Sequence, residues 1–284
     1  MTYGNIIHTI TGRQRLLPLG RACCGLLLLL LTACEKEIPI DYRDAAGLYA
    51  AEAVLTQKEC TVRLSTTQSV TDNSTADHNI ADATVVLSSE GEVLDTLKYG
   101  ADGVYKSAIG GMAGFVYDLD IYVGDRHFHS SSTMQEEPQL SSFRFVWKKF
   151  FSERMLFAQL RIDDKPRQQN YYFMHIYRNR VGYRWAVTTD EGNPGGELQQ
   201  LFSCTTERQM DNNDEDALRD GDQIRLEVRA IDRLSYDYLY SMQVMDNSGS
   251  NPIANFSGGC LGYFSACHVV TRNYTFRTAD VEEE

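Results

Sequence analysis

The sequence lacks a hydrophobic segment long enough to cross a membrane. Its longest apolar run is the six leucines Leu26–Leu31. They lie within a stretch of about ten apolar residues, whereas a membrane-spanning helix needs about 20. Arg13, Arg15 and Arg21 precede the run, and no acidic residue occurs before Glu35. A basic segment, a short apolar segment and small residues, in that order, predict an N-terminal export signal.

The chain also lacks an excess of basic residues. Lys and Arg number 27 against 39 Asp and Glu, which gives a net charge of −12. The first 33 residues hold three arginines and no acid, so the rest of the chain is more acidic still. A protein that binds nucleic acid must neutralise phosphates with basic side chains, and adhesion to anionic head groups needs basic residues too. The composition therefore argues against both partners and is typical of a well-solvated surface.

The local motifs that mark common active sites are missing as well. The sequence has no Gly-x-Ser-x-Gly elbow, no His-Glu-x-x-His, no Walker loop and no Gly-x-Gly-x-x-Gly. His127 and His129 lie on one face of an expected strand, where such a pair holds a metal or, more often, forms a surface ladder. The acidic run 211–216 lacks the glycine and the distal glutamate of an EF-hand loop. We therefore predict a non-enzymatic protein with no cofactor and no metal.

The end of the export signal defines a candidate lipidation site. Leu31-Thr32-Ala33-Cys34 matches the bacterial lipobox, in which an apolar residue and two small residues precede the cysteine that receives lipid. We predict that residues 1–33 are a lipoprotein signal peptide, that Cys34 is lipidated, and that residues 34–47 are a tether. An ordinary secretory signal is the alternative.

Four cysteines follow Cys34 in the sequence: Cys60, Cys204, Cys260 and Cys267. An exported chain lies in an oxidising compartment, and four thiols allow three pairings. Cys260 and Cys267 are close enough in sequence to bridge a tight bend, which would leave Cys60 to pair with Cys204. Four buried free thiols are the alternative. A zinc site is not expected, because no Cys-x-x-Cys accompanies them.

Short strands separated by turn residues fill residues 48–135. Ala83–Ser88 and Val93–Lys98 flank a hairpin connection in which Gly91 supplies a positive φ. Apolar and polar residues alternate from Phe115 to Tyr122, the period of a half-buried strand. Six or seven strands at this spacing predict a β-sandwich domain of immunoglobulin-like or transthyretin-like type.

Residues 136–284 predict a second β-rich domain with one short helix. Its clearest strand is Ile224–Ala230, in which apolar residues alternate with charged ones. Ser235 is expected to cap the helix at its N-terminus, and Val281–Glu284 is expected to be a frayed tail.

Several of these segments together resemble one known family. They are the lipobox, the acidic tether, Ala81–Leu87, Asp102–Tyr105, Tyr117–Leu119, Leu201–Cys204, Ile224–Tyr240 and the closing run Gly258–Ala266. In this order they are similar to the Bacteroidota lipoproteins grouped as domain of unknown function 4249. The resemblance covers nearly the whole mature chain, and the closing run is its most specific part. The family supplies no catalytic or ligand residues to carry over.

The resemblance implies an outer-membrane lipoprotein, often encoded beside a TonB-dependent transporter. Glu35 and Glu37 resemble the surface-export signal of the same phylum. We therefore expect a lipid-anchored binding or accessory subunit, displayed at the surface, whose partner is an outer-membrane transporter. A structural or adhesive surface lipoprotein is the alternative, and a hydrolase with a dispersed site is a third. Segments 211–222 and 247–257 are the expected contact loops.

Overall fold

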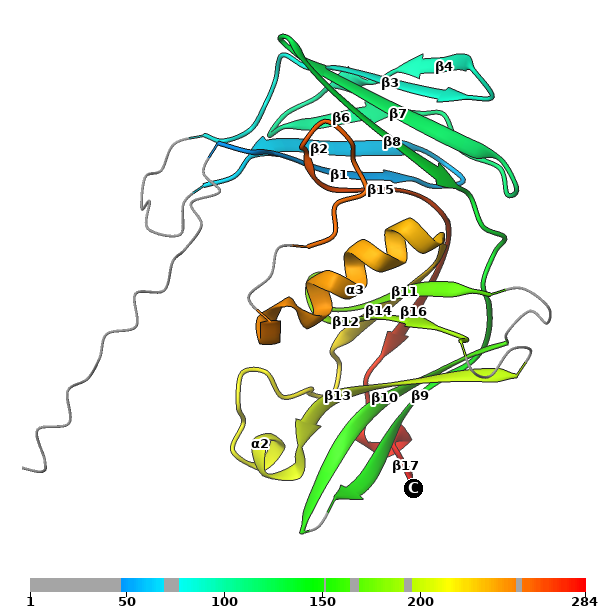
Figure 1. The fold of residues 1–284 in the computed structure, drawn as a ribbon. Coiled ribbons are helices and arrows are strands. Elements are labelled where there is room, and N and C mark those ends of the chain that lie inside the picture. Colours follow the sequence, from blue (N-terminus) through cyan, green and yellow to red (C-terminus); the bar gives the residue numbers. More distant parts are fainter. Residues whose placement is uncertain (1–46, 69–76, 151, 164–168, 192–195, 249–251) are drawn as a thin grey trace, which may run out of the picture. The chain divides into compact units, whose positions relative to one another are not determined.

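The computed structural model describes residues 47–68, 77–150, 152–163, 169–191, 196–248 and 252–284 (Figure 1). These residues fold mainly as β-sheet, which confirms the predicted fold class. The predicted signal peptide, Cys34 and residues 34–46 of the predicted tether lie outside the described residues. No helix in the described ranges is both long and apolar enough to cross a membrane.

Two sheets form the first β-sandwich, with strand orders β15-β1-β2-β6-β5 and β4-β3-β7-β8. The strands are β1 (Tyr49–Leu55), β2 (Cys60–Thr66), β3 (Thr84–Ser89), β4 (Glu92–Thr96), β5 (Lys98–Tyr99), β6 (Val104–Ser107), β7 (Val116–Val123), β8 (Arg126–Thr133) and β15 (Leu261–Ala266). Alternate residues of β1, β3 and β7 are buried and form one apolar core between the sheets. The alternation thus places the charged residues of these strands on the outer faces.

Strand β15 joins the first sandwich although it comes from the far end of the sequence. It pairs in parallel with β1, from Ala50 opposite Leu261 to Leu55 opposite Ala266. The sequence predicted a domain division between residues 135 and 136. That division assigns β15 to the second domain, although the strand pairs in the first sandwich, and it stays a prediction. Parallel pairing over such a sequence separation has no local sequence signal.

Two further sheets, with strand orders β13-β10-β9-β17 and β12-β11-β14-β16, enclose a second core. The strands are β9 (Gln139–Phe150), β10 (Glu153–Asp163), β11 (Tyr171–Arg178), β12 (Val181–Thr189), β13 (Glu197–Thr206), β14 (Gln223–Ile231), β16 (His268–Thr275) and β17 (Glu282–Glu283). A short helix α2 (Glu207–Asp211) follows β13 and begins with a capping box between Thr206 and Gln209. The frayed tail expected at Val281–Glu284 is wrong, because β17 pairs with β9.

Helix α3 (Arg233–Ser248) covers part of the outer face of the sheet that contains β14 (Figure 1). The predicted N-cap at Ser235 is wrong, because the carboxylate of Asp232 accepts the Ser235 N–H at 2.9 Å. The other oxygen of Asp232 accepts from the Ser132 hydroxyl at 2.6 Å and the Thr133 N–H at 3.0 Å. One side chain therefore fixes both the start of α3 and the end of β8.

Candidate functional site

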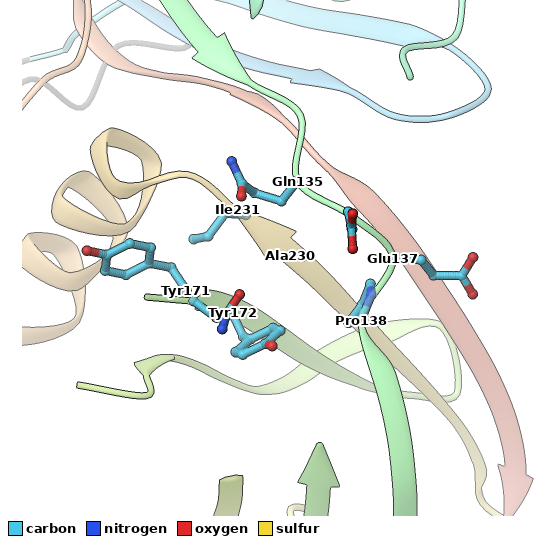
Figure 2. A pocket seen from close by; sticks show the side chains of 9 residues that line it. Gln135, Glu137, Pro138, Tyr171, Tyr172, Ala230 and Ile231 are labelled. Atoms are coloured by element: carbon cyan, nitrogen blue, oxygen red, sulfur yellow. The ribbon is translucent and has the colours of Figure 1, made fainter. Parts of the chain in front are cut away.

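Among the hollows within the described residues, two differ greatly in size, and a third of about 290 Å³ lies beside α2. Figure 2 shows the smaller one, between the segment from Gln135 to Pro138 and the strand ends at Tyr171, Tyr172 and Ile231. Its volume of about 10 Å³ holds about one water molecule. The larger hollow has a volume of about 410 Å³, within the usual range of about 300–1,000 Å³ for small-molecule sites. We take this larger hollow, the polar cleft, as the candidate site.

The polar cleft is lined by the outer face of the first sandwich and by strands of the sheet that carries β14. Its lining consists of Glu52, Val54, Thr56, Glu59, Thr61, Arg63, Val104, Glu227, Arg229, Tyr263 and Val269. Strand alternation explains the charges, since the opposite faces of β1, β2 and β14 are packed in the two cores. Glu52 and Arg63 are exposed and stand opposite each other on β1 and β2.

An ion pair between the largely buried side chains of Glu227 and Arg229 forms part of one wall of the polar cleft. Nε of Arg229 donates to Oε1 of Glu227 at 2.8 Å, and its Nη2 forms an ion pair with the same oxygen at 2.6 Å. Arg225 Nη1 donates to Oε2 at 3.3 Å. The Glu227 side chain is only 10% exposed, so water has little access to its contacts. The guanidinium groups also lie over aromatic rings: Arg229 is 5.1 Å from the Phe173 centroid and Arg225 is 3.9 Å from that of Tyr177. The wall is therefore charged but held rigidly.

Groups that could act as a nucleophile beside this wall are held in their neutral forms. Burial raises the pKa of the Tyr263 hydroxyl to about 12 and that of the neighbouring Cys267 thiol to about 11. Tyr263 also stacks on Tyr238, with ring centroids 5.1 Å apart. A thiol or phenol with a raised pKa is a poor nucleophile near neutral pH. The wall can therefore donate and accept hydrogen bonds, a chemistry that suits binding.

None of the four described cysteines takes part in a disulfide. Cys60, Cys204, Cys260 and Cys267 are all buried free thiols, which was the alternative to the predicted pairings. Strand β15 separates Cys260 from Cys267, and at about 3.3 Å per residue it places their Cα atoms roughly 20 Å apart. A disulfide needs a separation below about 7 Å. Cys60 and Cys204 belong to different cores.

These thiols are expected to resist modification in the native protein. Burial raises the pKa to about 12 for Cys60 and Cys260 and to about 11 for Cys204 and Cys267, so almost no thiolate exists at pH 8. Iodoacetamide should label none of the four in the folded chain and all four in denaturant, as read by peptide mass spectrometry. A disulfide-linked peptide pair, or equal labelling in both states, would contradict this expectation.

The two histidines considered for a metal are held by one carboxylate. Asp120 Oδ1 lies 2.7 Å from Nε2 of His127 and 3.0 Å from Nδ1 of His129, on the outer face of the β7–β8 hairpin. Tyr122 stacks on the His127 ring at 4.5 Å. Within the described ranges no group of three or more His, Cys, Asp and Glu side chains is arranged to hold a metal ion.

The structure describes the first of the two expected contact loops, 211–222, in full and the second, 247–257, only in part. Residues 211–216 are exposed, but Ala217 and Leu218 are buried, and the Asp222 carboxylate accepts from Arg178 Nε at 2.7 Å. The second loop falls partly on residues 249–251, which lie outside the described residues. No described residue of either loop lines the polar cleft. Sequence reasoning recognised β14 as a strand but missed the site, although three consecutive outward positions with charges, Arg225, Glu227 and Arg229, mark a face that is not apolar.

Comparison with known proteins identifies a family. The sequence model of the family described as "Domain of unknown function (DUF4249)" matches residues 35–273, which include every residue that lines the polar cleft. None of the curated proteins matches the sequence.

Proposed function

The chain belongs to the DUF4249 family, and on this premise we propose that it is a non-enzymatic binding or accessory subunit of an outer-membrane, TonB-dependent transporter. In this proposal the protein is a bacterial lipoprotein held in the outer membrane through Cys34, and the polar cleft is the surface with which it engages the transporter or its cargo. A short lipid tether gives a high effective concentration at the membrane, so a weak interface is largely occupied.

The observation that carries this proposal is the construction of the polar cleft. Its volume of about 410 Å³ admits a small polar ligand or a few side chains of a partner loop. Its outer wall carries the exposed side chains of Glu52, Glu59 and Arg63. These charges can form ion pairs with a partner in place of their contacts with water. Its inner wall is the rigid Glu227–Arg229 pair. Rigid polar groups at the base of a hollow fix the orientation of what binds there.

Affinity purification tests the proposed association. The tagged full-length protein is extracted from its native membranes in mild detergent, with and without crosslinking, and co-purified proteins are identified by mass spectrometry. We expect an outer-membrane transporter in the wild-type eluate and much less of it with Arg63→Glu, which reverses one exposed charge in the cleft. If crosslinking captures no transporter and instead captures matrix or host components, an adhesive role replaces the proposed one.

The lipid anchor gives a separate prediction. Only a thiol can accept the diacylglycerol group, and stable anchoring needs two or more acyl chains. Cys34→Ser should therefore move the protein from the detergent phase to the aqueous phase in Triton X-114 partitioning, while Cys24→Ser, inside the predicted signal peptide, should leave it in the detergent phase. Continued partitioning of Cys34→Ser into detergent would show that the lipobox assignment is wrong.

A further inference from the structure

Strand β9 forms a long edge that is almost unpaired on one side. Eleven of its 12 residues pair with β10 on one side, whereas among the described residues only β17 (Figure 1) pairs with the other, at Val146 and Trp147. An open strand edge presents N–H and C=O groups that can pair with another extended chain. The two residues of β17 leave most of this edge available.

Acidic side chains on one face of the chain from Glu282 to Glu284 meet basic side chains of β9. Arg144 pairs with both Glu282 and Glu284, and Lys148 Nζ lies 2.5 Å from a Glu284 oxygen. The hydrogen bond from Lys148 lowers the pKa of Glu284. Arg144 Nε donates to the buried Gln159 at 2.7 Å, so the guanidinium is already oriented before an acid arrives.

On the opposite face of this segment, an acidic side chain again meets a basic one. Glu283 pairs with Arg154, whose guanidinium lies 4.9 Å from the centroid of the Trp147 ring and also pairs with Glu207. The backbone N–H of Glu284 donates to the Trp147 carbonyl at 3.0 Å. Because side chains of an extended segment alternate between faces, this edge recognises successive acidic residues from both sides.

The chain's own segment can use only part of the edge. Asp220 Oδ1 accepts the Thr278 N–H at 2.6 Å and the Thr278 hydroxyl at 2.7 Å, which holds residues 278–280 in a 3₁₀ turn rather than in a strand that pairs with β9. In a strand, the N–H and C=O groups of alternate residues face the same side. Those of Phe145 and Phe143 therefore face the same side as those of Trp147, and those of Phe143 lie beyond the two rungs that β17 fills.

We propose that the open edge of β9 is a docking site for an extended acidic peptide of another protein, with residues 282–284 acting as a displaceable occupant. The fitting peptide has an apolar residue before its acids, because Val281 packs against the core at this position. A free peptide can continue the ladder past Phe145 to Phe143. A two-residue ladder opens readily, so a peptide that forms the same ion pairs and adds further rungs displaces the occupant.

Peptide binding to the full-length chain tests this proposal. The probe is a fluorescent peptide of residues 278–284, Thr-Ala-Asp-Val-Glu-Glu-Glu, and its affinity is measured by anisotropy. We expect the variant Glu282→Gln/Glu283→Gln/Glu284→Gln to bind the probe at least tenfold more tightly than wild type does, because its own segment competes less. Binding should weaken as salt rises, and a probe with Gln in place of Glu should not bind.

Two further substitutions in the triple variant separate docking from general charge. Arg144→Gln removes the residue that contacts two acids and should weaken binding at least tenfold. Lys149→Gln removes an exposed charge on the same strand that makes no ion pair with β17, and should change binding less than twofold. Thermal unfolding confirms that each variant is folded. Equal affinity of wild type and triple variant, no binding to either, or equal effects of Arg144→Gln and Lys149→Gln would overturn the proposal.

Discussion

Replacing Gly262 by alanine is expected to lower the free energy of unfolding by about 2–6 kcal/mol, from overpacking and from backbone strain of about 1–3 kcal/mol each. Gly262 has a φ of +102°, and a Cβ there would lie 1.9 Å from the carbonyl oxygen of Ala51. That oxygen belongs to the backbone of β1, which pairs with β15 at this residue, so it cannot move without breaking the ladder. Thermal denaturation should show a fall of roughly 10 °C.

Gly259 provides the matched control, since it lies in the same segment. Its φ of +87° is also positive, but a Cβ there would meet no atom within 4 Å. Gly259→Ala should therefore cost only the conformational strain, about 1–2 kcal/mol. Equal losses for the two variants would show that the close contact between β15 and β1 does not determine stability.

Replacing Glu227 by alanine is the second change with a large expected effect. The substitution leaves Arg229, whose side chain is 18% exposed, without its carboxylate partner. Removing one member of a buried ion pair typically costs about 3–5 kcal/mol. Chemical denaturation should detect this loss, and Glu227→Gln, which keeps the shape and an acceptor oxygen, should cost less.

Two controls separate this effect from simple loss of charge. The double variant Glu227→Leu/Arg229→Met removes both members of the pair and should be more stable than Glu227→Ala, since no charge is left buried and unpaired. Asp237→Ala breaks the exposed pair with Arg233, which is 3.7 Å long, and should cost less than about 0.5 kcal/mol. If Glu227→Ala were as stable as the double variant, the claim that Glu227 and Arg229 form a buried ion pair would be contradicted.

Local pattern was sufficient to predict the strands with one buried face. Ile224–Ala230 was predicted from alternation alone, and the structure gives β14 as Gln223–Ile231. Strand β9 was not predicted, because Phe143 and Phe145 pack on one face while Val146 is buried on the other, which removes the alternation. The N-cap was misplaced because Ser235 has the right chemistry, but its hydroxyl is buried and donates to the Phe264 carbonyl at 3.2 Å.

The polar cleft could not be predicted from local pattern. Its walls come from strands more than 150 residues apart, such as Glu52 on β1 and Glu227 on β14. Alternation predicts that these charges face outward, but not which outward faces oppose each other. The same limit explains the cysteines: sequence proximity favoured pairing Cys260 with Cys267, whereas the extended β15 between them keeps them apart.

Site-specific photocrosslinking in native membranes tests the central claim most directly, namely that the polar cleft engages an outer-membrane transporter. A photoreactive amino acid replaces Thr61, which lines the cleft, or, as the control, Val93, which is 67% exposed on β4 in the other sheet of the first sandwich. The account predicts a crosslink to a TonB-dependent transporter from position 61 and none from position 93. No transporter crosslink from position 61, or equal crosslinks from both positions, would contradict it.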